Sequence, residues 1–125
     1  MDHFEKIAAR LTAYDLDAML LTGEANRFYA SGFHSAGTDG VALVTRNGNY
    51  YFTDSRYTEA AGRCVKNARL EETGRGRGYA VLTEEVAARE NIRRIGFEDA
   101  YMTVQDWERY RKNGAPRFLL GLLNV

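Results

Sequence analysis

The sequence has few of the features that anchor or cross-link several classes of protein. Its 125 residues include one cysteine, Cys64, and one proline, Pro116. A single cysteine excludes an internal disulfide framework. The longest apolar run lies near the C-terminus and falls far short of the ~20 residues that cross a bilayer. The first residues are charged and contain no apolar signal core, so we expect a cytoplasmic protein without a membrane partner.

The chain also lacks an excess of charge and a cluster of metal-binding side chains. Seventeen basic and seventeen acidic residues cancel, which leaves no overall field to hold a nucleic acid or an anionic membrane. The only two histidines are His3 and His34, and neither has a neighbour at the spacing of zinc ligands. We therefore predict no nucleic-acid partner, no metal site and no cofactor within this chain.

The sequence does contain an alternation of helical patterns with apolar strands. Strands are predicted at 18–21, 41–44, 50–53, 68–73, 94–98 and 118–123, and helices at 2–14, 26–31, 55–65, 79–90 and 103–113. Asn47-Gly48 between the second and third strands is a strong signal for a β-hairpin. The length suits a single domain. The pattern predicts an α/β fold, a three-layer α/β/α sandwich on a mixed sheet of about five or six strands with one hairpin.

Two helix ends carry specific expectations. Gly32 is expected to close the helix at 26–31 in a conformation with positive φ. The Asp54 carboxylate is expected to cap the helix at 55–65 by accepting hydrogen bonds from its first turn. The buried stripe predicted for that helix consists of Tyr57, Ala60, Ala61 and Cys64.

Three motifs, taken in order, resemble a known family. They are Asn26-x-x-Tyr29-x-Ser31-Gly32-Phe33, then Thr53-Asp54-x-Arg56-Tyr57-x-x-Ala60, then Ile95-Gly96-Phe97-Glu98. Together they resemble the N-terminal domain of Xaa-Pro aminopeptidases and prolidases, the creatinase-type "pita-bread" metallopeptidases. The resemblance covers nearly the whole chain and implies a sheet of ribonuclease-H-like character in one domain, residues 1–125. The family's C-terminal catalytic domain, with its two Asp, one His and two Glu metal ligands, has no counterpart here.

The resemblance also implies a function for the parent protein. A full-length relative would hydrolyse the bond before a proline with two divalent metal ions (Mn, Co or Zn) bound in the catalytic domain. The N-terminal domain would support a homodimer or larger homo-oligomer, and its loops would limit access of proline-containing peptides. Loops on a rigid scaffold often carry binding residues, and the position-matched loop contains Phe33, His34, Ser35 and Asp39.

Within this chain we predict no catalytic residue. The motif residues Asn26, Tyr29, Gly32, Asp54, Arg56 and Tyr57 are interpreted as structural, with Arg56 pairing locally. The neighbouring carboxylates Glu71-Glu72, Glu84-Glu85 and Glu98-Asp99 are interpreted as solvated charges, because adjacent side chains point apart. The glycine-rich segment at 74–78 does not fit the G-x-G-x-x-G spacing and is interpreted as a solvated loop.

Two other functions share these sequence features. The same N-terminal domain is found in creatinase-like amidinohydrolases, whose chemistry differs in the domain that is missing here. A related domain also occurs as a binding module without catalysis, in a histone chaperone. Intact metal ligands downstream would support either enzyme, and their loss would support the binding module.

Overall fold

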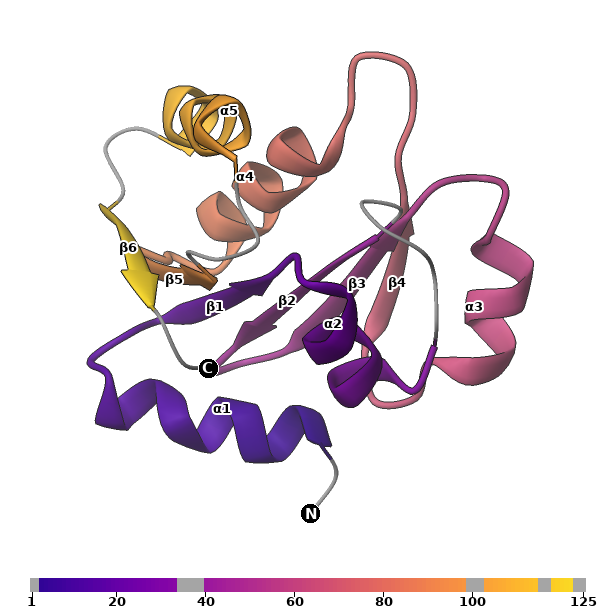
Figure 1. Cartoon of the computed structure of the whole chain (residues 1–125), viewed down its shortest axis with the longest axis horizontal. Coiled ribbons are helices and arrows are strands. Elements are labelled where there is room, and N and C mark those ends of the chain that lie inside the picture. The colour runs from indigo at the N-terminus through magenta and orange to yellow at the C-terminus, as the bar shows by residue number, and fades with distance from the viewer. Residues whose placement is uncertain (1–2, 34–39, 99–102, 115–117, 123–125) are drawn as a thin grey trace.

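The computed structural model describes residues 3–33, 40–98, 103–114 and 118–122. Six strands form one mixed sheet in the order β4-β3-β2-β1-β5-β6 (Figure 1). The strands are β1 (Ala18–Leu21), β2 (Val41–Thr45), β3 (Asn49–Thr53), β4 (Arg69–Glu72), β5 (Arg94–Glu98) and β6 (Phe118–Leu122). The helices are α1 (His3–Ala13), α2 (Glu24–Ser31), α3 (Thr58–Cys64), α4 (Tyr79–Arg89) and α5 (Val104–Gly114).

One strand runs against all the others. β2 is antiparallel to both β1 and β3, whereas β4 is parallel to β3, β5 is parallel to β1 and β6 is parallel to β5. The predicted hairpin is confirmed: Thr45 and Gly48 close it through a backbone hydrogen bond of 2.9 Å. As a result, the C-terminal ends of β1, β3, β4, β5 and β6 lie along one border of the sheet, here named the C-terminal edge.

The apolar strands bury both of their faces. In β1, Ala18 and Leu20 belong to one core cluster, and Met19 and Leu21 belong to the other. Helices α4 and α5 contribute to the first cluster, and α1, α2 and α3 cover the opposite face (Figure 1). The predicted three-layer sandwich is therefore confirmed, including the ribonuclease-H-like run of an antiparallel β3–β2–β1 followed by parallel strands.

The outermost strand explains an unusual composition. β4 has the sequence Arg-Leu-Glu-Glu, and none of its residues is fully buried. It pairs only with β3 among the described strands. Charged side chains at a sheet edge discourage pairing with other chains.

The start of α3 differs from the prediction. The helix begins at Thr58, after a turn at 55–57 in which the Tyr57 N–H donates to the Asp54 carbonyl. The predicted cap is wrong, because the Asp54 carboxylate accepts hydrogen bonds from Arg56 and no side chain caps α3. The prediction that Cys64 is buried is also wrong, because Cys64 is exposed. Ala61, a predicted member of the buried stripe, faces the core together with Val65, four residues later.

None of the helices in the described ranges is both long enough and apolar enough to span a bilayer.

Candidate functional site

The C-terminal edge of the sheet brings the three sequence motifs together. The first motif begins just after β1, the second follows the end of β3, and the third is β5 itself. β1 and β5 are parallel neighbours, with Leu20 opposite Phe97. In open α/β sheets, ligands bind outside the carboxyl ends of the strands, so this edge is the first place to look for a site.

Glu98, at the end of β5, connects two of these motifs. Its side chain is only 3% exposed. Oε1 accepts from the Gly23 N–H at 2.9 Å, and Oε2 accepts from Asn26 Nδ2 at 2.8 Å. Gly23 is the N-cap of α2 and has no side chain with which to satisfy the free N–H groups there. A carboxylate at a helix N-terminus is also favoured by the helix dipole.

This contact corrects the interpretation of Glu98 as a solvated charge. The parallel pairing of β5 with β1 places the end of β5 beside the chain that leaves β1, where α2 starts. Asn26 thus connects α2 to the end of β5 through this hydrogen bond, in keeping with the structural role predicted for it.

Arg27 is a buried residue that the sequence analysis did not identify. Its side chain is 1% exposed, and Nη1 donates to the Gly40 carbonyl at 2.7 Å. Because Gly40 immediately precedes β2, this bond ties α2 to the start of the next strand. Arginine is rarely fully buried, and nothing in the local pattern distinguishes Arg27 from a solvated helix residue.

The C-terminal end of α2 matches its prediction. Gly32 has φ 75°, and its N–H donates to the Phe28 carbonyl at 2.8 Å. Ser31 Oγ donates to the Arg27 carbonyl at 2.6 Å and accepts from the Phe33 N–H at 3.1 Å. The Ser31 hydroxyl is thus engaged in capping the helix.

Phe33 is an anchor in the core. It is 7% exposed and meets the rings of Tyr51 and Tyr57 edge-on, at centroid distances of 6.0 and 6.3 Å. Phe33 and Tyr57, from different motifs, therefore pack together. The other predicted gating residues, His34, Ser35 and Asp39, lie outside the described residues.

Asp54 and Arg56 form a local pair. The Asp54 carboxylate accepts from the Arg56 N–H and Nε, both at 3.0 Å, and from Nη2 at 2.8 Å. The side-chain hydrogen bond from Arg56 is the main reason why the pKa of Asp54 is lowered. The Arg56 guanidinium also lies 5.1 Å from the centroid of the Tyr57 ring. The predicted local pairing of Arg56 is confirmed.

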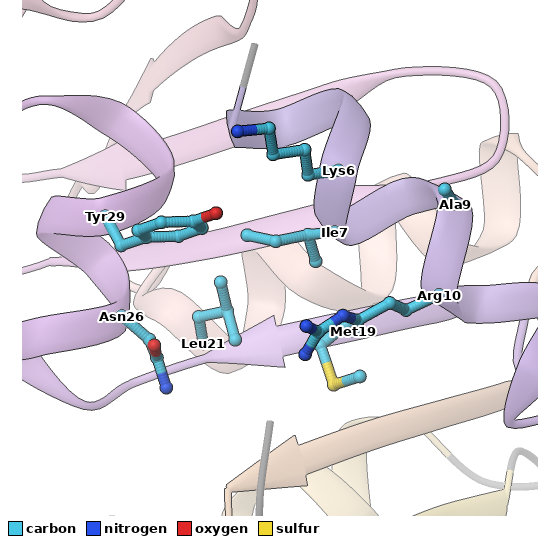
Figure 2. A pocket seen from close by; sticks show the side chains of 8 residues that line it. All are labelled: Lys6, Ile7, Ala9, Arg10, Met19, Leu21, Asn26 and Tyr29. Atoms are coloured by element: carbon cyan, nitrogen blue, oxygen red, sulfur yellow. The ribbon is translucent and has the colours of Figure 1, made fainter. Parts of the chain in front are cut away.

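Tyr29 is an accessible residue of the first motif. Its side chain is 42% exposed and stacks on His3, with ring centroids 4.1 Å apart and an interplanar angle of 2°. His3 Nδ1 also donates to the Tyr29 carbonyl. Tyr29 and Asn26 line a groove of about 550 Å³ between α1, α2 and β1, here named the α1–α2 groove (Figure 2).

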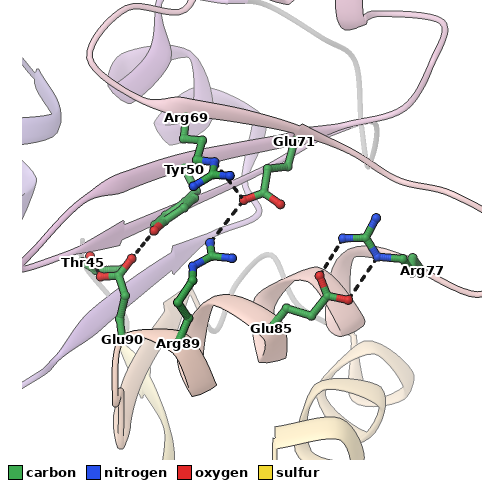
Figure 3. Close-up of polar contacts among 8 residues, drawn as sticks. All are labelled: Thr45, Tyr50, Arg69, Glu71, Arg77, Glu85, Arg89 and Glu90. Carbon is green, nitrogen blue, oxygen red and sulfur yellow. Dashed lines mark hydrogen bonds and ion pairs between the residues drawn. The ribbon is translucent and has the colours of Figure 1, made fainter.

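Another polar cluster lies on the face of the sheet that α4 covers (Figure 3). Glu90 accepts hydrogen bonds from Tyr50 Oη and, at 2.7 Å, from Thr45 Oγ1. Arg89 pairs with Glu71 at 3.4 Å and lies 5.5 Å from the centroid of the Tyr50 ring. Burial, followed by the hydrogen bond with Glu90, raises the pKa of Tyr50. These contacts fasten the C-terminal end of α4 to β2, β3 and β4.

The glycine-rich segment before α4 is a tight turn. Gly74 and Arg77 form an isolated bridge, and Gly76 has φ 74°. Arg77 forms a two-pronged ion pair with Glu85, at 2.6 and 3.0 Å. The glycines therefore serve the turn, while Arg77 ties it to α4.

Metal-binding and catalytic side chains do not converge in the described ranges. Within 3–33, 40–98, 103–114 and 118–122, no three His, Cys, Asp or Glu side chains are grouped so that they could hold a metal ion. The carboxylates of Glu98 and Asp54 are occupied by hydrogen bonds from neighbouring motif residues. The geometry supports a scaffold at the C-terminal edge, and the α1–α2 groove is an accessible site among the described residues.

The sequence of this chain is similar to those of known proteins. The family model of the Creatinase/Prolidase N-terminal domain matches residues 4–118. The uncharacterized peptidase YqhT of Bacillus subtilis (strain 168) is 31% identical over 106 residues, which are 85% of this chain and 29% of that protein. The chain thus spans less than a third of this curated relative.

Solved structures show the same fold. An Xaa-Pro aminopeptidase (aminopeptidase P) from Streptococcus thermophilus has a TM-score of 0.86 at 24% identity, covering 98% of this chain and 91% of that chain. The N-terminal domain of the cytoplasmic peptidase PepQ from Mycobacterium tuberculosis H37Rv has a TM-score of 0.78 at 23% identity, covering 96% and 90%. Since the family model spans all three motifs, the chain belongs to the creatinase/prolidase N-terminal domain family.

Proposed function

We propose that this chain is the non-catalytic N-terminal domain of a metal-dependent peptidase that hydrolyses Xaa-Pro bonds. The observation that carries the proposal is that the family's motif residues are used inside the fold: Glu98 holds Asn26 and the start of α2, and Asp54 holds Arg56. Similarity to an Xaa-Pro aminopeptidase and to the peptidase YqhT supports the choice of substrate. The role of such a domain is to support the assembly and the access of substrate to a catalytic centre.

The metal ions of the proposed reaction do not fit the described part of this chain, which offers no suitable group of ligands. We assign the two divalent ions (Mn, Co or Zn) to a C-terminal catalytic domain, the main partner of this one. The 29% share of YqhT that the chain spans supports such a further domain. A cytoplasmic location is proposed from the similarity to PepQ.

The test compares the chain with its full-length parent. With manganese, cobalt or zinc added, the 125-residue chain is expected to release nothing from Xaa-Pro dipeptides, whereas the full-length protein should do so. Metal-dependent turnover by the chain alone that persists through a second purification would contradict the proposal. A full-length protein that cleaves creatine-like substrates instead would favour the amidinohydrolase alternative.

We further propose that the domain supports a homo-oligomer and that Phe33, His34, Ser35 and Asp39 limit access to a neighbouring active site. Both described ends of this loop are fixed, Phe33 by its aromatic contacts and Gly40 by Arg27. A loop with fixed ends can position and confine a short substrate.

Replacing His34 and Asp39 together with alanine in the full-length protein tests this role. We expect kcat/KM for Xaa-Pro dipeptides to fall about ten- to a hundredfold, with metal content and fold unchanged. Steady-state assays on a dipeptide and on a longer peptide measure the effect. Unchanged kcat/KM for both substrates would remove the loop from the active site.

A further inference from the structure

The α1–α2 groove has the size and the mixed lining of a small-molecule site. Its volume is about 550 Å³, within the range of about 300–1,000 Å³ typical of ligand pockets. Its apolar residues are Ile7 and Ala9 from α1 and Met19 and Leu21 from β1. Its polar residues are Lys6, Arg10, Asn26 and Tyr29. The motifs discussed above account for Asn26 but assign no role to the two cations.

Lys6 and Arg10 give the groove a positive side. They are four residues apart on α1, so both lie on the same face of the helix. Figure 2 shows the Arg10 guanidinium beside Met19 and the Lys6 chain extending toward the Tyr29 hydroxyl. Neither cation forms an ion pair with any acidic residue in the described ranges. A groove with two cations and no matching carboxylate favours an anionic ligand.

The opposite wall is held in place before any ligand arrives. The Tyr29 ring is stacked on His3, whose Nδ1 also donates to the Tyr29 carbonyl. The Asn26 amide is oriented by its bond from Nδ2 to Glu98, which leaves its oxygen to accept from a ligand N–H. Such preorganisation lowers the entropic cost of binding. The wall therefore offers an aromatic surface and a hydrogen-bond acceptor opposite the two cations.

From this arrangement we infer that the α1–α2 groove binds a small ligand with a carboxylate and an apolar group. Lys6 and Arg10, whose charged groups lie on either side of Ile7, attract the carboxylate, and Ile7 and Tyr29 contact the apolar group. The C-terminus of a short peptide has this chemistry, and the N-terminal ammonium of an Xaa-Pro dipeptide adds an N–H donor for Asn26, since the bond to proline has none. The preference for a peptide over another apolar carboxylate rests on the proposed function, whereas the carboxylate site itself does not.

The experiment is a titration of the isotopically labelled 125-residue chain, followed by the amide shifts in its NMR spectrum. The probes are the dipeptide Phe-Pro, its C-terminal amide, 3-phenylpropionate and inorganic phosphate. We expect Phe-Pro to shift residues of α1, α2 and β1 with a Kd on the order of 1 mM. The amide should bind about tenfold more weakly, because it lacks the charge that the two cations recognise.

Variants identify the residues responsible. K6Q and R10Q together should weaken Phe-Pro about fivefold or more, while K6R should retain the binding of the native chain. K66Q and R75Q together remove the same charge from exposed positions elsewhere and should have no effect. Because all of these side chains lie on the surface, the variants are expected to fold.

Each outcome decides the inference. Equal binding of 3-phenylpropionate and Phe-Pro would support the carboxylate site and identify a non-peptide source. Equal binding of the amide and the free acid, the same shifts with phosphate, or no shifts in α1 and α2 at several-millimolar Phe-Pro would overturn it. None of these measurements involves catalysis, so failure here is separable from failure of the proposed peptidase function.

Discussion

The buried carboxylate of Glu98, in the third motif, is hydrogen-bonded to Asn26 of the first motif. It satisfies the Gly23 N–H and the Asn26 side chain at once, and it is 3% exposed. Removing it leaves one buried donor, the Gly23 N–H, and one partly buried donor, Asn26 Nδ2, without their acceptor, which has a larger effect on stability than the loss of a bond between exposed groups. The residue thus connects the end of β5 to the start of α2.

Replacing Glu98 with alanine should lower the free energy of unfolding by roughly 1–3 kcal/mol, the cost of buried polar groups left unpaired. Glu98→Gln should have a smaller effect, since the amide can still accept from Gly23 but loses the charge at the helix N-terminus. Urea denaturation measures both. The control is Glu108→Ala, on the exposed side of α5. A loss for Glu98→Ala no greater than for this control would contradict the role assigned to Glu98.

Sequence patterns identified residues whose role is local and missed those whose role depends on distant segments. Gly32 was predicted from a helix ending, and the structure confirms its positive φ angle. Arg27 and Glu98 were missed because their partners lie 13 and 72–75 residues away. Periodicity reports which face of an element is apolar, but it does not report which backbone group a buried charge will meet.

At the scale of elements, apolar runs and turn residues were sufficient to predict the hairpin and the described strands other than β4, whose only large apolar residue is Leu70. The start of α3 could not be predicted in the same way. Asp54 can accept from a helix N-terminus or from an arginine two residues later, and the sequence allows both. In the structure, the Asp54 carboxylate accepts hydrogen bonds from the Arg56 side chain. α3 begins only at Thr58, after the turn at 55–57.

This turn gives a pH-dependent prediction. Because the pKa of Asp54 is lowered in the folded protein from its ordinary value of 3.8, mainly by Arg56, the pair stabilises the fold above that value. The stabilisation should disappear as the pH falls through the lowered pKa. Asp54→Asn should therefore cost up to about 1 kcal/mol at neutral pH, a small effect because Arg56 is largely exposed, and nothing in strong acid.

Urea denaturation of the native chain and of Asp54→Asn from pH 7 to pH 2 measures this difference. In an Arg56→Gln background, the same substitution should have little effect at any pH in that range. A difference that grew as the pH was lowered would have the wrong sign for a carboxylate stabilised by a cation.

For the whole molecule, the remaining question is what covers its exposed aromatic surface. Phe28 and Tyr29, neighbours on α2, are 49% and 42% exposed. Adjacent exposed aromatic residues are typical of interaction surfaces. They lie on α2, the helix that carries the first motif, and Tyr29 also lines the α1–α2 groove. This position suits a surface that a second copy or a catalytic domain would cover.

We therefore expect the 125-residue chain to form dimers or larger species as its concentration is raised. Sedimentation velocity should show the average mass increasing over the micromolar to millimolar range. Phe28→Asp should shift this equilibrium toward the monomer, because it introduces a charge that must lose its hydration when the surface is covered. Val104→Asp, at a single exposed apolar position on α5 that is 75% accessible, is the matched control and should leave the equilibrium unchanged. A native chain that remains monomeric at the highest concentration would show that α2 does not associate on its own, and would leave the catalytic domain as the partner for this surface.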